Sequence, residues 1–222
     1  MTKTELARYF DHTVLKPDAT RAKVEQLCDE ARTHGFHTVC VNPWWVQTAA
    51  KRLSGSSVLP IAVIGFPLGM IPTTCKASEV QKVIDDGARE IDMVVSLGAY
   101  FSGDEKAVRD DIQGVVKACG KVPLKVILET GYLTAAQVAE LTAWSAEAGA
   151  AFVKTSTGFG PRGASLADIK TMKATLASKA AWSTVGIKAS GGIKTLAFVR
   201  ELISAGATRI GSSATVEIMA EL

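Results

Sequence analysis

The sequence predicts an α/β protein, a (β/α)8 TIM barrel with a short N-terminal helix, formed as one domain over residues 1–222. Eight short apolar segments alternate with segments of helical periodicity, and parallel strands that are covered on both faces read as continuous apolar runs. The length of 222 residues fits an eight-stranded barrel. An open doubly wound sheet is the alternative, but no Gly-x-Gly-x-x-Gly motif opens a first βα unit.

The first elements are set by local signals. A helix is expected at 4–10 and a strand at 10–15, which ends at Pro17 because proline lacks an amide donor. The next helix, 19–33, has Thr20 as its N-cap, and Gly35 ends it.

The same alternation continues to the end of the chain. Further strands are expected at 37–43, 57–66, 90–95, 123–129, 150–154, 184–189 and 207–211. Helices are expected between and after these strands. Three of them run from Pro43 to Leu53, from a cap at Thr73 or Thr74 to Asp86, and over residues 104–119. The next begins after Thr134, where Gln137 completes a capping box, and the last three begin at Ser165, Thr195 and Ser212.

The composition indicates an ordinary globular protein, with 47% apolar and 21% charged residues. No apolar run approaches the roughly 20 residues of a membrane span, and the N-terminus lacks the pattern of a signal peptide, so a cytoplasmic location is expected. The net charge of +3 is dispersed, which gives no support to nucleic-acid binding. The four cysteines and three histidines lack metal-ligand spacing, so neither a metal nor a cofactor is predicted.

Two apolar strands each end on a lysine that is followed by small residues and glycine. These are Lys154 in Phe152-Val153-Lys154-Thr155-Ser156-Thr157-Gly158 and Lys188 in Ile187-Lys188-Ala189-Ser190-Gly191-Gly192. Because the carboxyl ends of barrel strands form one face, we expect both ammonium groups in one pocket. Two ammonium groups in one pocket repel each other, which disfavours the folded state but favours an unprotonated amine that can act in catalysis.

The pKa shift that an amine nucleophile needs can be compared with the shift that a second ammonium produces. A lysine with a pKa of about 10.4 is neutral in only about one molecule in 2,500 at pH 7, and only the neutral amine attacks a carbonyl. Lowering that pKa to about 7 takes roughly 4 to 5 kcal/mol. A second ammonium at about 4 Å contributes on the order of 4 kcal/mol, and burial acts in the same direction. The pair therefore predicts an amine nucleophile that forms an imine with an aldehyde or ketone.

Other polar residues at strand ends have two readings. Asp92, in an otherwise apolar strand, is either a structural partner of a lysine or a functional acid. Lys125 shares a strand face with Glu129, so it is either half of an interior ion pair or part of the site. Asp11 is either a strand-end residue or a pocket residue. Cys40 reads as a small core residue rather than a nucleophile.

Glycine and serine residues after the last two strands indicate an anion site. Ser190-Gly191-Gly192 and Gly211-Ser212-Ser213 occupy the positions where many barrels hold phosphate with backbone amides. Arg162, after the sixth strand, would add a positive charge, although a solvated arginine is the default.

These segments resemble the deoxyribose-phosphate aldolase family, in order and over nearly the whole chain. The similarity includes Asp11-His12-Thr13, Cys40 with its flanking residues, Glu90-Ile91-Asp92, and the segment around Lys125; Lys154-Thr155-Ser156-Thr157-Gly158 is specific to the family. The resemblance implies a class I aldolase that reversibly cleaves 2-deoxy-D-ribose 5-phosphate to acetaldehyde and D-glyceraldehyde 3-phosphate without a cofactor.

The resemblance also implies roles for single residues. Lys154 corresponds to the Schiff-base lysine, Lys188 to the lysine that lowers its pKa, and Asp92 to the acid/base group. The residues implied at the substrate are Asp11, Thr13, Cys40, Lys125 and Thr157, and those implied at the phosphate are Gly158, Gly191, Gly192, Gly211, Ser212 and Ser213.

One position departs from the family pattern. Some members carry a lysine directly after the Thr-Gly of the sixth-strand motif, where this chain has Phe159, so the charge would pass to Arg162. Rival interpretations are another imine-forming sugar-phosphate or transaldolase-like barrel, a phosphate-binding isomerase, and a sugar-phosphate sensor. The expected partners are small aldehydes and sugar phosphates, with no nucleic acid or membrane, and a homodimer is compatible with apolar positions on the helices.

Overall fold

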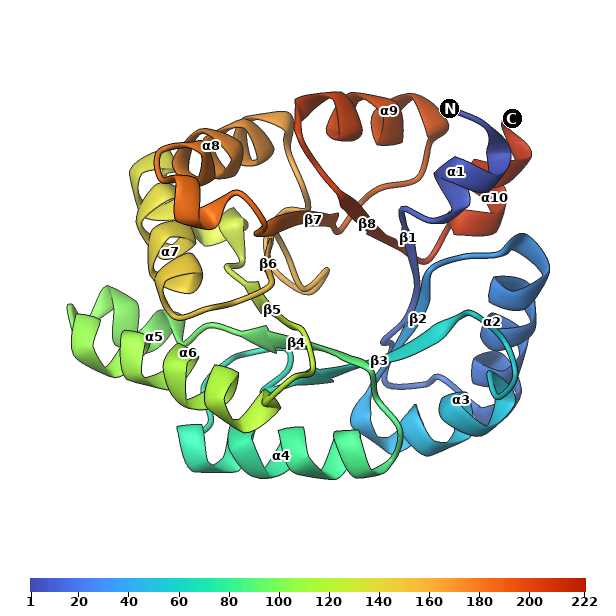
Figure 1. Ribbon diagram of the computed structural model, residues 1–222, viewed down its shortest axis with the longest axis horizontal. Helices are drawn as coiled ribbons and strands as arrows, with labels where there is room; N and C mark the ends of the chain where they lie inside the picture. The colour runs from blue at the N-terminus through green and yellow to red at the C-terminus, as the bar shows by residue number, and fades with distance from the viewer.

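The computed structural model describes all residues from Met1 to Leu222. Eight parallel strands pair in sequence order and close into a barrel, with β1 beside β8. The helices surround this ring of strands (Figure 1). The predicted (β/α)8 fold is therefore confirmed.

The strands are short and run in this order: β1 Phe10–Val14, β2 Thr38–Val41, β3 Leu59–Ile64, β4 Glu90–Val94, β5 Leu124–Ile127, β6 Phe152–Lys154, β7 Gly186–Ser190 and β8 Arg209–Ser212. The α-helices are α1 Lys3–Ala7, α2 Arg21–His34, α3 Val46–Arg52, α4 Thr73–Asp85, α5 Leu97–Phe101, α6 Glu105–Cys119, α7 Ala135–Glu147, α8 Leu166–Ala177, α9 Leu196–Ala205 and α10 Thr215–Ala220. Three 3-10 turns, at Pro43–Trp45, Thr130–Tyr132 and Ala180–Trp182, lie between these elements. No helix combines the length and apolar composition needed to cross a membrane.

Most predicted helix ends are confirmed by the caps. The side chains of Thr20, Ser165 and Thr195 accept hydrogen bonds from backbone amides in the first turns of α2, α8 and α9. Thr134 and Gln137 form the predicted capping box of α7. Gly35 ends α2 with a φ of 69°, in the left-handed region that glycine occupies without a steric penalty.

The predicted threonine cap of α4 was wrong. The N-cap is Pro72, which offers no side-chain acceptor, and Thr73 is already the first helical residue. Its hydroxyl instead donates to Asp111 of α6 at 2.8 Å. The 3-10 turn Pro43–Trp45 and α3 together occupy the helix expected from Pro43 to Leu53. Helix α5 and the other two 3-10 turns are only three to five residues long and were not predicted.

The apolar core lies mainly between the barrel and its helices, where a cluster of 50 buried residues packs. Inside the barrel only a small apolar cluster forms, from Cys40, Ile61 and Val63 on β2 and β3. The other strands direct polar and charged side chains inward. Acidic and basic side chains from β1, β4, β5, β6, β7 and β8 therefore meet in the interior, where the ring of Phe152 also lies close to Lys125 and Arg209, and this places the site.

Candidate active site

The site is built by strand register. Lys125 pairs with Asp92 across β4 and β5, and Lys154 pairs with Lys188 across β6 and β7. Since strand side chains alternate between the two faces, these four point into the barrel together. All four residues are at most 2% exposed.

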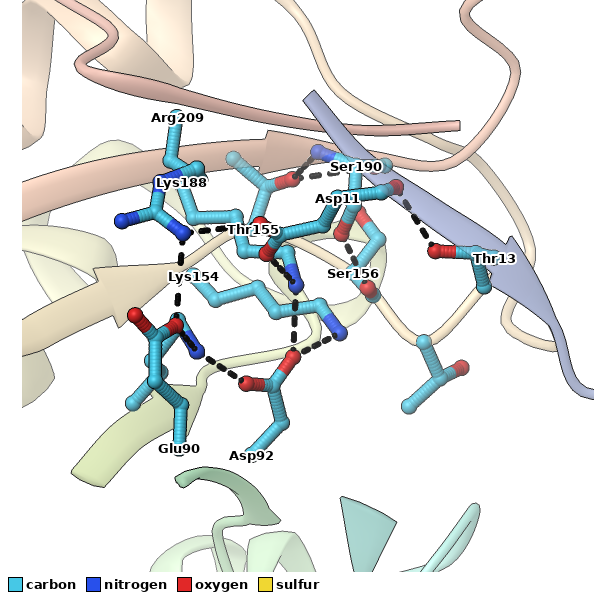
Figure 2. Close-up of polar contacts among 12 residues, drawn as sticks. Asp11, Thr13, Glu90, Asp92, Lys154, Thr155, Ser156, Lys188, Ser190 and Arg209 are labelled. Atoms are coloured by element: carbon cyan, nitrogen blue, oxygen red, sulfur yellow. Dashed lines mark hydrogen bonds and ion pairs between the residues drawn. The ribbon is translucent and has the colours of Figure 1, made fainter. Parts of the chain in front are cut away.

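Asp92 is the centre of the cluster (Figure 2). The Nζ atoms of Lys154 and Lys188 both donate to its Oδ2, each at 2.8 Å, and Lys125 Nζ donates to its Oδ1 at 2.9 Å. The two lysines thus share one carboxylate oxygen, which confirms the prediction that their ammonium groups lie in one pocket. Three donors on one carboxylate also hold all four side chains in fixed positions.

The cluster extends toward the opposite end of the barrel. Lys188 Nζ lies 2.5 Å from Asp11 Oδ2, and Arg209 Nη1 donates to Asp11 Oδ1 at 2.8 Å. Glu90 links two cations of the cluster, because its Oε2 lies 2.6 Å from Lys125 Nζ and 3.3 Å from Arg209 Nη1. No role was predicted for Glu90 or Arg209. Each lies two residues before a predicted site residue, Asp92 and Gly211 respectively.

Burial and neighbouring charges give the two lysines different pKa values. Burial lowers the pKa of Lys154, Asp92 opposes this, and Lys188 acts in the same direction as burial, so the net shift is downward. Burial also acts to lower the pKa of Lys188, but Asp11 and Asp92 outweigh it and the net shift is upward. Lys154 is therefore the amine that loses its proton more readily. Burial is thus a larger cause of the lowered pKa of Lys154 than the second ammonium, the reverse of the order expected from the sequence.

The carboxylates respond in the opposite sense to the same cations. Burial raises the pKa of Asp92, but Lys125, Lys154 and Lys188 together bring it well below its ordinary value. Burial acts in the same way on Glu90, and the net effect of His37, Lys125 and other neighbours lowers its pKa to about 2. Both groups are charged at neutral pH.

A cavity of about 700 Å³ opens at the carboxyl ends of the strands and reaches both lysines. It brings together ten of the predicted site residues: Thr13, Lys154, Thr157, Gly158, Lys188, Gly191, Gly192, Gly211, Ser212 and Ser213. Asp11, Cys40, Asp92 and Lys125 are not in its wall and are buried with no exposed area.

The predicted anion loops form part of the cavity wall. Gly191 and Gly192 follow β7 with φ values of 88° and 72°, which few residues other than glycine adopt. Gly211 has a different reason to be glycine, since an added Cβ would lie 2.9 Å from Lys188 Cε. Ser212 donates to Ile193 O at 2.7 Å and accepts from Ala214 N, so its hydroxyl joins the loops after β7 and β8.

Two sequence-based interpretations need correction, the pairing of Lys125 with Glu129 and the position of Arg162 near the anion site. Lys125 does not pair with Glu129 but with Asp92 and Glu90, because the Glu129 carboxylate turns to the amide and hydroxyl of Thr157. Arg162 does not reach the cavity, since it pairs with Asp168 at 2.5 Å and donates to Thr130 O at 2.8 Å.

The remaining two predicted substrate residues have other neighbours in the structure. Thr13 Oγ1 donates to Asp11 O at 3.0 Å. Cys40 lies in the inner apolar cluster, and burial raises the pKa of its thiol. Cys40 is thus a core residue, as its apolar strand indicated.

The cavity wall also contains cations that sequence analysis did not single out. They are Lys16 after β1, Lys23 on α2 and Lys194 after β7. Lys16 and Lys194 lie in the loops after β1 and β7, and Lys23 lies on α2. Their positions beside the cavity therefore depend on how these segments pack against the barrel. The structure contains no group of three or more His, Cys, Asp or Glu side chains placed to hold a metal ion.

Comparisons with known proteins agree with this arrangement. Residues 6–215 match the model of the DeoC/LacD family aldolase. A deoxyribose-phosphate aldolase from Brevibacillus brevis is 48% identical over 212 residues, which cover 96% of this chain and 94% of the relative.

Solved structures are similar over the same length. A protein from Coccidioides immitis superimposes with a TM-score of 0.96 and 40% identity, covering 100% of this chain and 87% of that one. The tetrameric deoxyribose phosphate aldolase from Aeropyrum pernix superimposes with a TM-score of 0.89 and 33% identity, covering 99% and 92%. The barrel, its buried lysine pair and these similarities show that the chain belongs to the DeoC/LacD family of aldolases.

Proposed function

We propose that this chain, as a single aldolase domain over residues 1–222, is a class I aldolase that reversibly cleaves 2-deoxy-D-ribose 5-phosphate to acetaldehyde and D-glyceraldehyde 3-phosphate. The observation that carries the proposal is Lys154, a buried amine with a lowered pKa that faces a cavity of about 700 Å³. The relatives named as deoxyribose-phosphate aldolases support the choice of substrate.

Lys154 is proposed as the nucleophile. Its neutral amine adds to the aldehyde carbon of the open-chain sugar, and loss of water leaves a protonated imine. The C3 hydroxyl then loses its proton and the C2–C3 bond breaks, which releases D-glyceraldehyde 3-phosphate. The electron pair of the C2–C3 bond moves toward the imine and forms an enamine. Protonation of the enamine carbon and addition of water release acetaldehyde and restore the amine.

Asp92 and Lys188 are proposed to handle the charges in these steps. Asp92 Oδ2 is 2.8 Å from Lys154 Nζ, so it can accept and return the protons that move during imine formation. Lys188 remains cationic and opposes protonation of Lys154. Asp11 and Lys125 hold these two groups in place by ion pairs.

The cavity wall is proposed to bind the rest of the substrate. Thr13 and Thr157 would face the sugar hydroxyls, and Gly158, Gly191, Gly192, Gly211, Ser212 and Ser213 would surround the phosphate. Cys40 would contribute packing beneath the substrate rather than chemistry.

Trapping experiments test the proposal. Acetaldehyde followed by borohydride should leave a two-carbon adduct on Lys154, which peptide mass spectrometry locates. Lys154→Ala should bring cleavage of deoxyribose 5-phosphate to background, while Lys106→Ala, at a lysine whose side chain is 85% exposed, should retain native turnover. Absence of an adduct on Lys154, or full cleavage by Lys154→Ala, would contradict an imine mechanism at this residue; a native protein that forms no adduct and cleaves no substrate would favour an isomerase.

We also propose a cytoplasmic homo-oligomer, with a homodimer as the expected form. The description of the Aeropyrum pernix relative as tetrameric supports association of copies. Sedimentation equilibrium measures the mass directly, and a monomer at micromolar concentration would contradict the proposal.

A further inference from the structure

The buried cluster contains more charges than the proposed reaction needs. It consists of seven side chains: Asp11, Glu90, Asp92, Lys125, Lys154, Lys188 and Arg209. None of these residues is more than 7% exposed. Burying a charge costs free energy unless opposite charges are close by, so the balance of the set matters.

That balance is uneven when every member is ionised. Four cations face three carboxylates, an excess of one positive charge among side chains that are almost completely buried. Loss of one proton from a lysine makes the cluster neutral. Lys154 is the member whose pKa is lowered, whereas those of Lys125, Lys188 and Arg209 are raised.

Arg209, like Lys125, is a cation of the cluster that lies outside the cavity wall. It lies on β8 at the position that pairs with Lys188, its side chain is 9% exposed, and it is absent from the cavity wall. Its guanidinium holds Asp11 Oδ1 at 2.8 Å while Asp11 Oδ2 lies 2.5 Å from Lys188 (Figure 2). The charge of Arg209 therefore influences Lys188 through Asp11, and Lys188 in turn contacts Asp92, which binds Lys154.

We propose that Arg209 is a positioning residue for the aldolase reaction, which acts through Asp11 and Lys188 to keep the Lys154 amine unprotonated, and that Glu90 opposes it. Without Arg209, the charges around Lys154 sum to one negative charge, which favours the ammonium form. Without both Arg209 and Glu90, they sum to zero again, as in the native chain. This inference rests on the proposed function, in which Lys154 is the nucleophile.

Other titratable groups around Lys154 remain unchanged by these substitutions. Cys40 faces it from β2, and burial raises the pKa of that thiol, which keeps it neutral. Glu129, after β5, is buried and takes its hydrogen bonds from Thr157. His37 Nε2 lies 3.6 Å from Glu90 Oε1 at the far end of the cluster. Differences between variants therefore report on Arg209 and Glu90.

The test is the pH dependence of acetaldehyde trapping by borohydride on Lys154, together with the pH dependence of kcat/KM for deoxyribose 5-phosphate. Arg209→Gln should move the midpoint of trapping upward by about one pH unit, because it removes one positive charge from a buried network that reaches Lys154 through Asp11, Lys188 and Asp92. At neutral pH, kcat/KM should fall about tenfold and recover at higher pH, because only the fraction of neutral amine has changed.

Matched variants separate charge from packing. Glu90→Gln alone should move the midpoint downward, and the double variant Arg209→Gln/Glu90→Gln should return it to the native value. Arg209→Lys, which keeps the charge, should also give the native midpoint. Arg52→Gln, at a surface arginine paired with Asp29 in an exposed ion pair, should change nothing.

The outcomes are distinct. An unshifted midpoint in Arg209→Gln, or a double variant as displaced as Arg209→Gln, would overturn the inference, since a purely structural defect is not repaired by removing a second charge. If Arg209→Gln does not fold, Glu90→Gln still predicts a shift of opposite sign. Failure of the proposed function looks different, because the native protein would then give no adduct on Lys154 at any pH.

Discussion

Lys154 and Lys188 are the same residue type on adjacent strands, yet their surroundings give them opposite pKa shifts. Both donate to Asp92 Oδ2, but Lys188 also has Asp11 2.5 Å away. The second carboxylate keeps Lys188 charged, while Lys154 has only a share of one carboxylate to offset its burial. A difference of one ion pair thus gives the two lysines opposite pKa shifts, as the proposed roles of Lys154 as nucleophile and Lys188 as cation require.

Replacing Lys188 tests this distinction. Lys188→Leu removes the ammonium that opposes protonation of Lys154, so the pKa of Lys154 should rise and the acid limb of the pH–rate profile should move upward by about 1 to 2 pH units. The measurement is kcat/KM between pH 5 and 10. An unchanged profile would refute the role of Lys188, whatever happens to the absolute rate.

At the scale of elements, the strands direct the side chains and the loops after them shape the cavity. The loops after β6 and β7 touch through their backbones, since Ala164 N donates to Gly191 O at 3.1 Å. An added Cβ on Gly163 would lie 2.1 Å from that oxygen. Gly163 is thus required for close approach of the two loops, one of which contains the proposed phosphate site.

Gly163→Ala should therefore weaken binding of phosphorylated substrate. The methyl group forces the two loops apart, so KM for deoxyribose 5-phosphate should increase about tenfold or more. Trapping of acetaldehyde, which has no phosphate, should change much less. Equal losses for both reactions would show that the substitution disturbs Lys154 rather than the anion loop.

The cap of α7 provides a contrasting case. Thr134→Ala removes the side-chain acceptor for the amide of Gln137, and loss of such a cap costs about 1 kcal/mol. The free energy of unfolding in urea should fall by about this amount, with KM and kcat unchanged, because Thr134 is not in the cavity wall. A change in KM would mean that α7 influences the site.

At the scale of the whole molecule, the buried charges couple folding to pH. Burial acts to raise the pKa values of Asp11, Glu90 and Asp92, but the surrounding cations, together with His37 beside Glu90, outweigh it and lower all three below those of an unfolded chain. Carboxylates with lowered pKa stabilise the folded state at pH values above their unfolded pKa of about 4. This contribution is lost progressively as pH falls below about 4.

Stability should therefore decrease steeply between about pH 4 and pH 2. Urea unfolding followed by circular dichroism at pH 7, 4 and 3 measures this decrease. About 1 M NaCl screens exposed ion pairs but not buried ones, so the decrease should persist at high salt. Disappearance of the decrease in salt would indicate that surface charges cause it.

The sequence by itself determined the order of strands and helices, most helix caps and the inward lysines. These follow from local rules, namely the apolar runs of buried strands, cap residues and the alternation of side chains along a strand. Those rules placed Lys154 correctly at the end of β6, whereas Asp92 and Lys188 lie in the middle of β4 and β7.

Only the tertiary structure decided which of these groups meet. Strand register and barrel closure brought Glu90 and Arg209 into the cluster, turned Lys125 toward Asp92 rather than Glu129, and paired Arg162 with Asp168 away from the cavity. Barrel closure joins residues that are far apart in the sequence, such as Asp11 and Arg209, which are 198 positions apart. Local sequence patterns contain no information on such pairs, because each depends on the stagger of strands around the closed sheet.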